Sequence, residues 1–76
     1  MKSLNISLKL TSDVKNFVDI VNKYDYDVDL KSGRFVVDAK SIMGIFSLDL
    51  SKPITLEVRA DKCEPLLNDL KPFVVK

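Results

Sequence analysis

Apolar residues occupy every second position along three stretches of the chain, which is the pattern of a strand that buries one face. The first alternation runs through Leu4, Ile6, Leu8 and Leu10, and it predicts a strand over roughly residues 3 to 9. The second includes Tyr26, Val28 and Leu30, and the third includes Ile54, Leu56 and Val58. We predict a strand at each of these places.

A turn signal predicts a fourth strand. The segment Lys31-Ser32-Gly33-Arg34 contains a glycine, which readily adopts the positive φ that tight hairpin turns need. Phe35 to Val37 is then the returning strand of a hairpin.

Helical spacing begins after the first strand. Apolar residues at i, i+3, i+4 and i+7 predict a helix over about residues 12 to 23, with one stripe at Val14, Phe17, Val18 and Val21. We expect a hydroxyl N-cap from Thr11 or Ser12, with Asp13 near the positive end of the helix dipole.

Two further helices are predicted nearer the C-terminus. Residues 42 to 48 are too few and too glycine-interrupted for a long helix, but they suit two turns capped by the Ser41 hydroxyl, and Pro53 prevents continuation. Pro65 suits the first turn of a last helix, whose final turn Pro72 should disturb. The apolar stripe of this helix is Leu66, Leu67, Leu70 and Phe73.

These elements follow in the order βαββαβα. Because the strands alternate cleanly, we predict an α+β domain over residues 1–76 with a four-stranded antiparallel sheet and three helices on one face. A chain of 76 residues is too short for two separate cores.

Composition and charge limit the classes of binding partner that are expected. The chain is 46% hydrophobic and 30% charged, and its 12 basic and 11 acidic residues give a net charge of +1. This balance does not attract nucleic acid or an anionic bilayer, so neither is an expected partner. The start of the chain lacks the apolar block of a secretion signal, and runs such as Phe35-Val36-Val37 are far shorter than a membrane helix. We expect a cytoplasmic protein.

The sequence contains no histidine and one cysteine. Histidine is the commonest general base and metal ligand, and a lone cysteine forms no internal disulfide, so we expect no metal and no other cofactor. Without a base to activate it, the Cys63 thiol is expected to be a small semi-buried side chain rather than a nucleophile. Asp25, Asp27 and Asp29 lack the glycine and terminal glutamate of a calcium loop and are interpreted as a solvated strand face.

The segment Lys40-Ser41-Ile42-Met43-Gly44-Ile45-Phe46-Ser47-Leu48 resembles the regulatory region of HPr, the small phosphocarrier of the bacterial sugar phosphotransferase system. That region reads Lys-Ser-Ile-Met-Gly, then two apolar residues, then Ser-Leu. The likeness extends from about Val21 to Arg59 and includes Lys23-Tyr24-Asp25. It implies the open-faced β-sandwich of that family, which agrees with the predicted βαββαβα order.

The phosphocarrier half of the family signature is missing. HPr carries its phosphoryl group on a histidine at the start of the first helix, followed closely by Arg and Pro. Counting back without gaps from Lys23-Tyr24 places Leu10, Ser12 and Asp13 at these positions, and none of them matches. The connection before the helix is also shorter. We therefore expect no transfer through this chain from Enzyme I to a sugar permease component.

Two residues retain some phosphorylation chemistry. Ser41 matches the serine that HPr kinase phosphorylates in the family, although a serine before a short helix is also an ordinary cap. Asp13 could accept phosphate as an acyl phosphate, although an acid at this position also simply complements the helix dipole. One alternative function is therefore a phosphocarrier whose acceptor has moved to Ser41 or Asp13.

The short helix is the predicted interaction surface. The resemblance implies that Lys40, Ile42, Met43 and Phe46 contact a partner, with burial in the core as the alternative for Met43 and Phe46. Ile45 and Leu48 are expected in the core. The leading prediction is a non-enzymatic protein-binding or regulatory module with a protein partner. The chain is expected to be a monomer or a weak homodimer, and a further alternative is an architectural domain that dimerises through the short helix.

Overall fold

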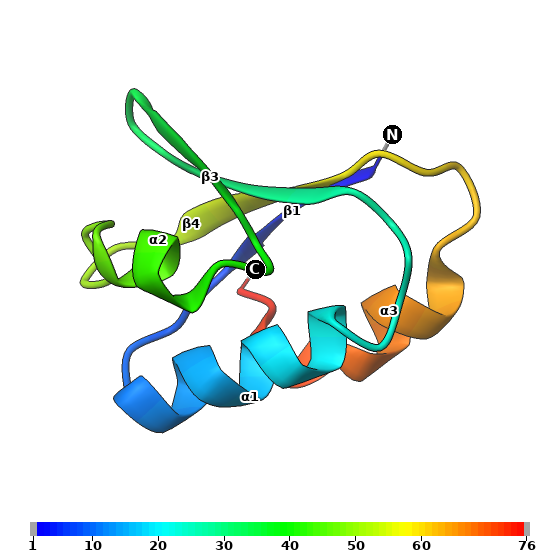
Figure 1. Ribbon diagram of the computed structural model, residues 1–76, viewed down its shortest axis with the longest axis horizontal. Helices are drawn as coiled ribbons and strands as arrows, with labels where there is room; N and C mark the ends of the chain where they lie inside the picture. The colour runs from blue at the N-terminus through cyan, green and yellow to red at the C-terminus, as the bar shows by residue number, and fades with distance from the viewer. Residues whose placement is uncertain (1, 76) are drawn as a thin grey trace.

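The computed structural model describes residues 2–75, in which four strands and three α-helices follow one another in the order βαββαβα (Figure 1). This order and the antiparallel sheet confirm the predicted fold class. The elements are β1 (Lys2–Ile6), α1 (Thr11–Val21), β2 (Val28–Ser32), β3 (Phe35–Asp38), α2 (Ile42–Phe46), β4 (Ile54–Val58), α3 (Glu64–Asp69) and a short 3-10 helix, η1 (Lys71–Phe73).

The four strands form one antiparallel sheet in the order β1-β4-β2-β3. Its register aligns four apolar residues in a row across the sheet, because Leu56 faces both Leu4 and Leu30, and Leu30 also faces Val37. Directly opposed residues in an antiparallel pair project to the same face. This row therefore belongs to the face that the helices cover.

The predicted hairpin is confirmed. Ser32 pairs with Phe35, which leaves Gly33 and Arg34 as a two-residue turn between β2 and β3. Gly33 has a φ of 59°, the positive value that a type II′ turn requires at its first central position.

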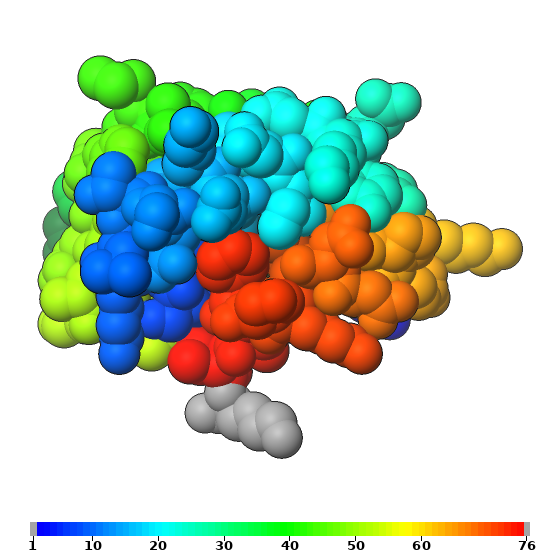
Figure 2. All heavy atoms as spheres, turned by 90° about the horizontal axis from the view of Figure 1, so that it is seen from below, coloured from blue at the N-terminus to red at the C-terminus, as the bar shows by residue number. Residues whose placement is uncertain are grey.

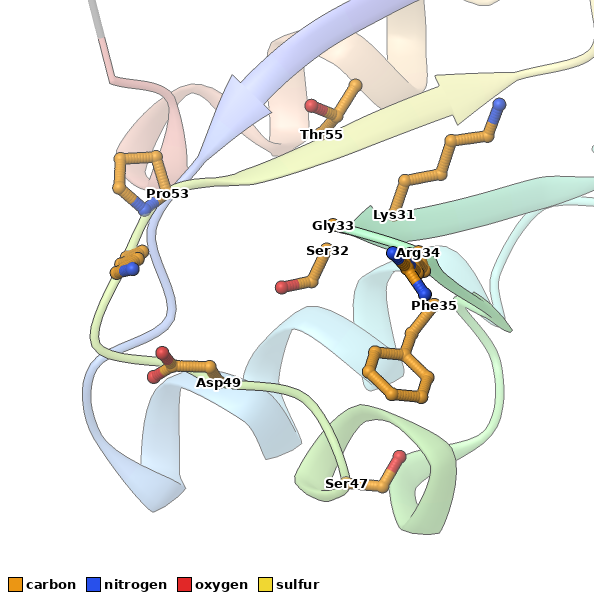
Figure 3. Close-up of a pocket in the computed structure, with 10 residues that line it drawn as sticks. Lys31, Ser32, Gly33, Arg34, Phe35, Ser47, Asp49, Pro53 and Thr55 are labelled. Atoms are coloured by element: carbon orange, nitrogen blue, oxygen red, sulfur yellow. The ribbon is translucent and has the colours of Figure 1, made fainter.

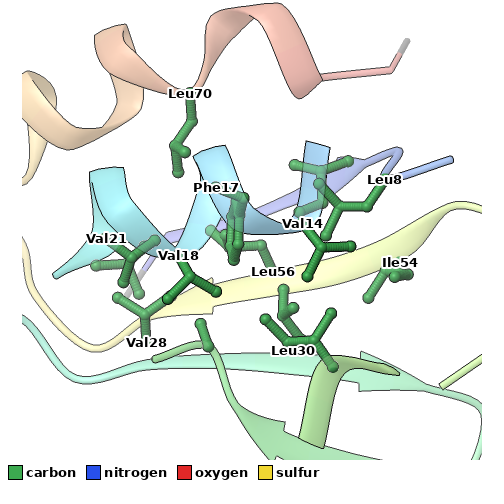
Figure 4. Close-up of a cluster of buried hydrophobic side chains, with 14 of the residues drawn as sticks. Leu8, Val14, Phe17, Val18, Val21, Val28, Leu30, Ile54, Leu56 and Leu70 are labelled. Carbon is green, nitrogen blue, oxygen red and sulfur yellow. The ribbon is translucent and has the colours of Figure 1, made fainter. Parts of the chain in front are cut away.

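The core lies between the sheet and the helices (Figure 4). Figure 2 shows α1, α3 and the C-terminal segment covering the lower face of the molecule. The Phe17 ring is fully buried and meets Phe73 edge to face, with ring centroids 6.1 Å apart. All four residues of the predicted stripe on α1 are buried, as are two members of the stripe on α3, Leu66 and Leu70.

The opposite face of the sheet carries charged pairs that link neighbouring strands. Lys31 Nζ lies 3.0 Å from Glu57 Oε2, and Arg59 Nη2 lies 2.6 Å from Asp29 Oδ2. Charged side chains keep this face compatible with water, in line with the predicted arrangement of helices on one face.

The first strand is shorter than predicted. Beyond Ile6 the chain leaves the sheet register: the Ser7 N–H donates to the Phe73 carbonyl at 2.8 Å, and Leu8 is buried outside any strand. Leu10, which the alternation placed on the buried face, is 63% exposed, so that prediction was wrong. It fails because β1 has already ended before Leu10.

The first helix begins one residue earlier than predicted, at Thr11. The predicted hydroxyl cap was wrong, because Thr11 and Ser12 are the first two helical residues and Leu10 is the N-cap. The expected disturbance near Pro72 is confirmed: α3 ends at Asp69, and Pro72 lies in η1.

Candidate functional site

Leu10, Ser12 and Asp13 lie together at the start of α1. The Leu10 side chain is exposed and has no atom that can accept a phosphoryl group. Asp13 Oδ2 accepts a hydrogen bond from the Leu10 N–H at 3.2 Å, and the Asp13 N–H donates to the Leu10 carbonyl at 3.0 Å. A carboxylate therefore already occupies the positive end of this helix.

Ser41 is the N-cap of α2, as predicted. Its backbone is extended, and its Oγ accepts a hydrogen bond from the Gly44 N–H at 3.2 Å. At the other end of the helix, Ser47 Oγ donates to the Gly44 carbonyl at 2.5 Å. A Cβ on Gly44 would lie 3.3 Å from Val37 Cβ and 3.2 Å from Ser41 Oγ, so glycine permits this close approach of α2 to β3.

Three apolar side chains of α2 are exposed to solvent, and we call them the α2 patch. Met43 is 79% exposed, Phe46 43% and Ile42 37%. Ile45 and Leu48 are buried, which confirms their predicted place in the core. The short helix thus anchors itself through Ile45 and leaves three apolar side chains without a place in the core.

Lys40 has a structural role that the sequence did not indicate. Its Nζ donates to the Tyr24 carbonyl at 3.0 Å, and its N–H donates to Asp38 Oδ1 at 2.9 Å. The bond to Tyr24 ties the segment before α2 to the loop after α1, and the bond to Asp38 fixes the turn between β3 and α2. A partner that contacts the Lys40 ammonium has to share it with the Tyr24 carbonyl.

The remaining sequence candidates lie apart from the α2 patch. Cys63 is fully buried, so it is more enclosed than the semi-buried thiol expected from the sequence. Asp25 and Asp27 precede β2, so the interpretation of Asp25, Asp27 and Asp29 as one strand face was wrong for the first two. In residues 2–75 no three His, Cys, Asp or Glu side chains gather in a way that could hold a metal ion.

Sequence reasoning missed two hydrogen bonds that shift pKa values. The Tyr24 hydroxyl donates to Asp69 Oδ2 at 2.5 Å, and this bond raises the pKa of Tyr24. Ser51 Oγ donates to Asp49 Oδ1 at 2.5 Å, which lowers the pKa of Asp49. Residues 24 and 69 are far apart in the sequence, so no local pattern reports their contact.

A surface cavity of about 510 Å³ lies between the β2–β3 hairpin, the end of α2 and the start of β4 (Figure 3). Its charged lining residues have both signs, with Asp49 near Lys52. The Phe35 ring projects from β3 toward the side on which α2 and Ser47 lie. No local sequence pattern indicates this cavity, because three separate segments build it.

None of the helices in the described part of the chain is long and apolar enough to span a membrane.

Comparison with known proteins agrees with this geometry. The family model described as "PTS HPr component phosphorylation site" matches residues 13–73, a span that begins after Leu10 and Ser12. No curated protein sequence matches the chain significantly.

Solved structures of HPr proteins have the same fold. HPr-C-His from Thermoanaerobacter tengcongensis is 27% identical with a TM-score of 0.80, and the alignment covers 97% of this chain and 91% of that one. The phosphocarrier protein HPr from Bacillus anthracis is 30% identical with a TM-score of 0.72, covering 97% and 94%. Crh, the catabolite repression containing protein of Bacillus subtilis, whose structure is described as a swapped, intertwined dimer, is 26% identical with a TM-score of 0.66, covering 96% and 90%. This chain belongs to the HPr family.

Proposed function

We propose that this HPr-family chain binds a protein partner through the α2 patch and relays no phosphoryl group, so that it acts as a non-enzymatic regulatory module. The observation that carries the proposal is the exposure of Ile42, Met43 and Phe46 on a helix whose remaining apolar residue, Ile45, is fully buried. Apolar side chains gathered on one short helix are typical of an interaction surface.

The chemistry at the start of α1 argues against phosphoryl relay. A phosphohistidine requires an imidazole nitrogen, and these 76 residues contain none. The aliphatic side chain of Leu10 cannot replace it, and the Asp13 carboxylate bonded to the Leu10 N–H repels phosphoryl oxygens by like charge. A helix N-terminus that holds its own anion is a poor site for a second one.

The α2 patch has the chemistry of a small docking surface. Full burial of a Met or Phe side chain contributes roughly 1.5 to 3 kcal/mol, so covering Met43 and Phe46 supplies useful binding energy. Methionine also adapts its shape to a partner. The hydroxyls of Ser41 and Ser47, at the two ends of α2, give the patch polar margins.

Ser41 is the proposed control point. Its side chain is exposed and lies directly before Ile42, the first residue of the patch. Phosphorylation of this hydroxyl adds about −1.5 to −2 charge and alters the N-cap hydrogen bond to Gly44. The same surface then changes from apolar to strongly anionic at one end, which changes the partners it accepts.

Phosphoryl transfer is tested by intact mass. The purified chain is incubated with phosphoenolpyruvate and Enzyme I, with the Bacillus anthracis HPr as the positive control. We expect no gain for this chain, whereas a gain of about 80 Da would overturn the proposal. The variants Ser41→Ala and Asp13→Asn then show which residue accepted the group.

A parallel reaction with ATP and HPr kinase tests Ser41, with Ser41→Ala as its control.

Partner binding is tested by capture followed by reconstitution. A protein retained by the wild-type chain is purified, and its Kd is measured for the wild type, Met43→Asp and Phe46→Asp. Val74→Asp is the matched control, because it makes the same kind of change at an apolar residue that is 38% exposed and lies outside both α2 and β3. We expect at least about a tenfold weaker Kd for the two α2 variants only. Equal losses in all three variants, or in none, would contradict docking through α2.

A further inference from the structure

The edge strand β3 exposes apolar side chains. It is the last strand in the order β1-β4-β2-β3, and within residues 2–75 no other strand pairs with its outer side. Phe35 is 69% exposed and Val36 is 55% exposed. An edge strand with exposed apolar residues is a template for pairing with another strand.

The pattern of hydrogen bonds between β2 and β3 shows which backbone groups of β3 point toward its free edge. The Ala39 N–H donates to the Val28 carbonyl at 2.9 Å, so residues 28 and 39 form a hydrogen-bonded pair. Such pairs alternate with non-bonded pairs along an antiparallel ladder, and Val36 therefore falls in a non-bonded pair with Lys31. Its N–H and C=O point away from β2, toward the free edge.

The side chains of β3 divide cleanly between the two faces. Val37 pairs with the buried Leu30 and faces the helices, and Phe35 shares this face two residues earlier. Val36 pairs with Lys31 on the face that carries the charged pairs. Arg34 and Asp38 are each two residues from Val36, so they lie on the same face of the sheet as Val36.

The segment from Arg34 to Asp38 is complementary to itself. In an antiparallel pairing of two copies about a two-fold axis at Val36, each Val36 faces its equivalent. Each Phe35 then faces Val37 of the other copy, and each Arg34 faces Asp38 of the other copy. Opposite charges directly across an antiparallel pair are stabilising, and aromatic side chains pair well with β-branched ones.

We propose that this chain forms a homodimer in which β3 pairs antiparallel with β3 of a second copy, centred on Val36, to extend the sheet across the two-fold axis. The register between the two β3 strands can change only in steps of two residues if the helices of both copies are to lie on the same side of the joined sheet. A shift in one direction places Arg34 opposite Lys40, which is repulsive, and a shift in the other separates Arg34 from Asp38. Charge complementarity therefore selects the register centred on Val36.

The expected dimer is weak, because one short strand from each copy buries less surface than a stable interface needs. It uses neither the α2 patch nor the start of α1, so it does not depend on the proposed function. The partner at this edge is a second copy of this chain. An antiparallel copy of residues 34 to 38 places Asp38 opposite Arg34 and Arg34 opposite Asp38, so that both charges are paired.

Sedimentation velocity over about 10 µM to about 1 mM measures the dimer Kd. We expect the wild type to dimerise in this range. Arg34→Asp and Asp38→Arg each place like charges across both ends of the interface, so each should weaken the Kd at least about tenfold. Lys15→Asp, the same change of charge on α1, is the control and should leave the Kd unchanged. Far-UV circular dichroism verifies that each variant is folded.

Mixing the two destabilised variants gives the decisive measurement. A heterodimer of Arg34→Asp with Asp38→Arg has opposite charges at both ends, so the mixture should dimerise at concentrations where each variant alone is a monomer. A wild type that stays monomeric throughout the range would overturn the proposal. A dimer that ignores these charges, including one formed by exchange of β1 or one lost in Phe46→Asp alone, would overturn it as well.

Discussion

The Asp13 carboxylate accepts a hydrogen bond from the backbone N–H of Leu10 at 3.2 Å, so the first turn of α1 is capped by an anion of the chain itself. Leu10 occupies the N-cap position but has no side-chain acceptor. Asp13 therefore satisfies the backbone N–H of the N-cap residue, as the N3 side chain of a capping box does. This relationship links the stability of α1 with the proposed absence of phosphoryl transfer at the same place.

Replacing Asp13 with alanine should destabilise the fold. Asp13→Ala removes an acceptor for the Leu10 N–H and a favourable charge at the helix start, which together are worth about 0.5 to 2 kcal/mol. Urea unfolding at neutral pH measures the change. The control is Asp19→Ala, because Asp19 lies in the same helix near its negative end and its removal should be neutral or stabilising. Equal destabilisation by both variants would show that the position of the charge does not matter.

The N-cap of α2 gives a second test. Ser41→Ala removes the acceptor for the Gly44 N–H and should lower the free energy of unfolding by about 1 kcal/mol. Ser41→Asp keeps an acceptor at the N-cap and should retain most of the stability while adding negative charge beside Ile42. If urea unfolding shows the same loss for both variants, the hydrogen bond is not what stabilises α2. If Ser41→Asp keeps its stability but changes partner affinity, charge acts on the α2 patch independently of folding.

Features that depend on nearby residues were predictable from the sequence. The hairpin turn follows from a single requirement, the positive φ of Gly33, and the α2 cap depends on Ser41 and Gly44, three positions apart. The buried stripe of α1 follows from helical spacing. Local sequence contains all the information that these features need.

Features that depend on distant segments were not predictable. The alternation that ends at Leu10 continues past the end of β1, and only the structure shows that the C-terminal segment, through the Phe73 carbonyl, meets the chain just after Ile6. The cap of α1 was assigned to a hydroxyl because Thr11 and Ser12 are common caps, whereas the helix starts one residue earlier. The bond between Tyr24 and Asp69 joins α3 to the loop after α1.

The Tyr24 hydroxyl predicts a pH-dependent contact. Its hydrogen bond to Asp69 favours the protonated phenol and raises its pKa above the ordinary value of 10.0. A group whose pKa is raised on folding stabilises the fold at pH below its unfolded value and loses that contribution as pH rises through the folded value. The contact between α3 and the loop after α1 should therefore persist at neutral pH and weaken in strong alkali.

Ultraviolet absorbance of tyrosinate measures this titration. The chain has two tyrosines, so Tyr24→Phe should remove the component that titrates above pH 10, and Asp69→Asn should move that component down toward the ordinary value. Glu64→Gln, which removes an exposed acid at the start of α3, is the control for the loss of negative charge. An unchanged titration curve in Asp69→Asn would contradict the assigned cause of the shift.

The buried thiol gives the last prediction. Cys63 is fully buried beside α3, and its Sγ lies 3.9 Å from the Ala60 carbonyl oxygen. A reagent can reach this sulfur only when the start of α3 opens, so the rate of modification by a thiol reagent should follow local or global unfolding. We expect slow reaction in buffer and fast reaction in urea, measured by absorbance or intact mass. A core variant such as Phe17→Leu, which loosens the packing against Phe73, should speed the reaction in buffer. Fast modification of the folded wild type would instead show an accessible thiol and would reopen the question of chemistry at Cys63.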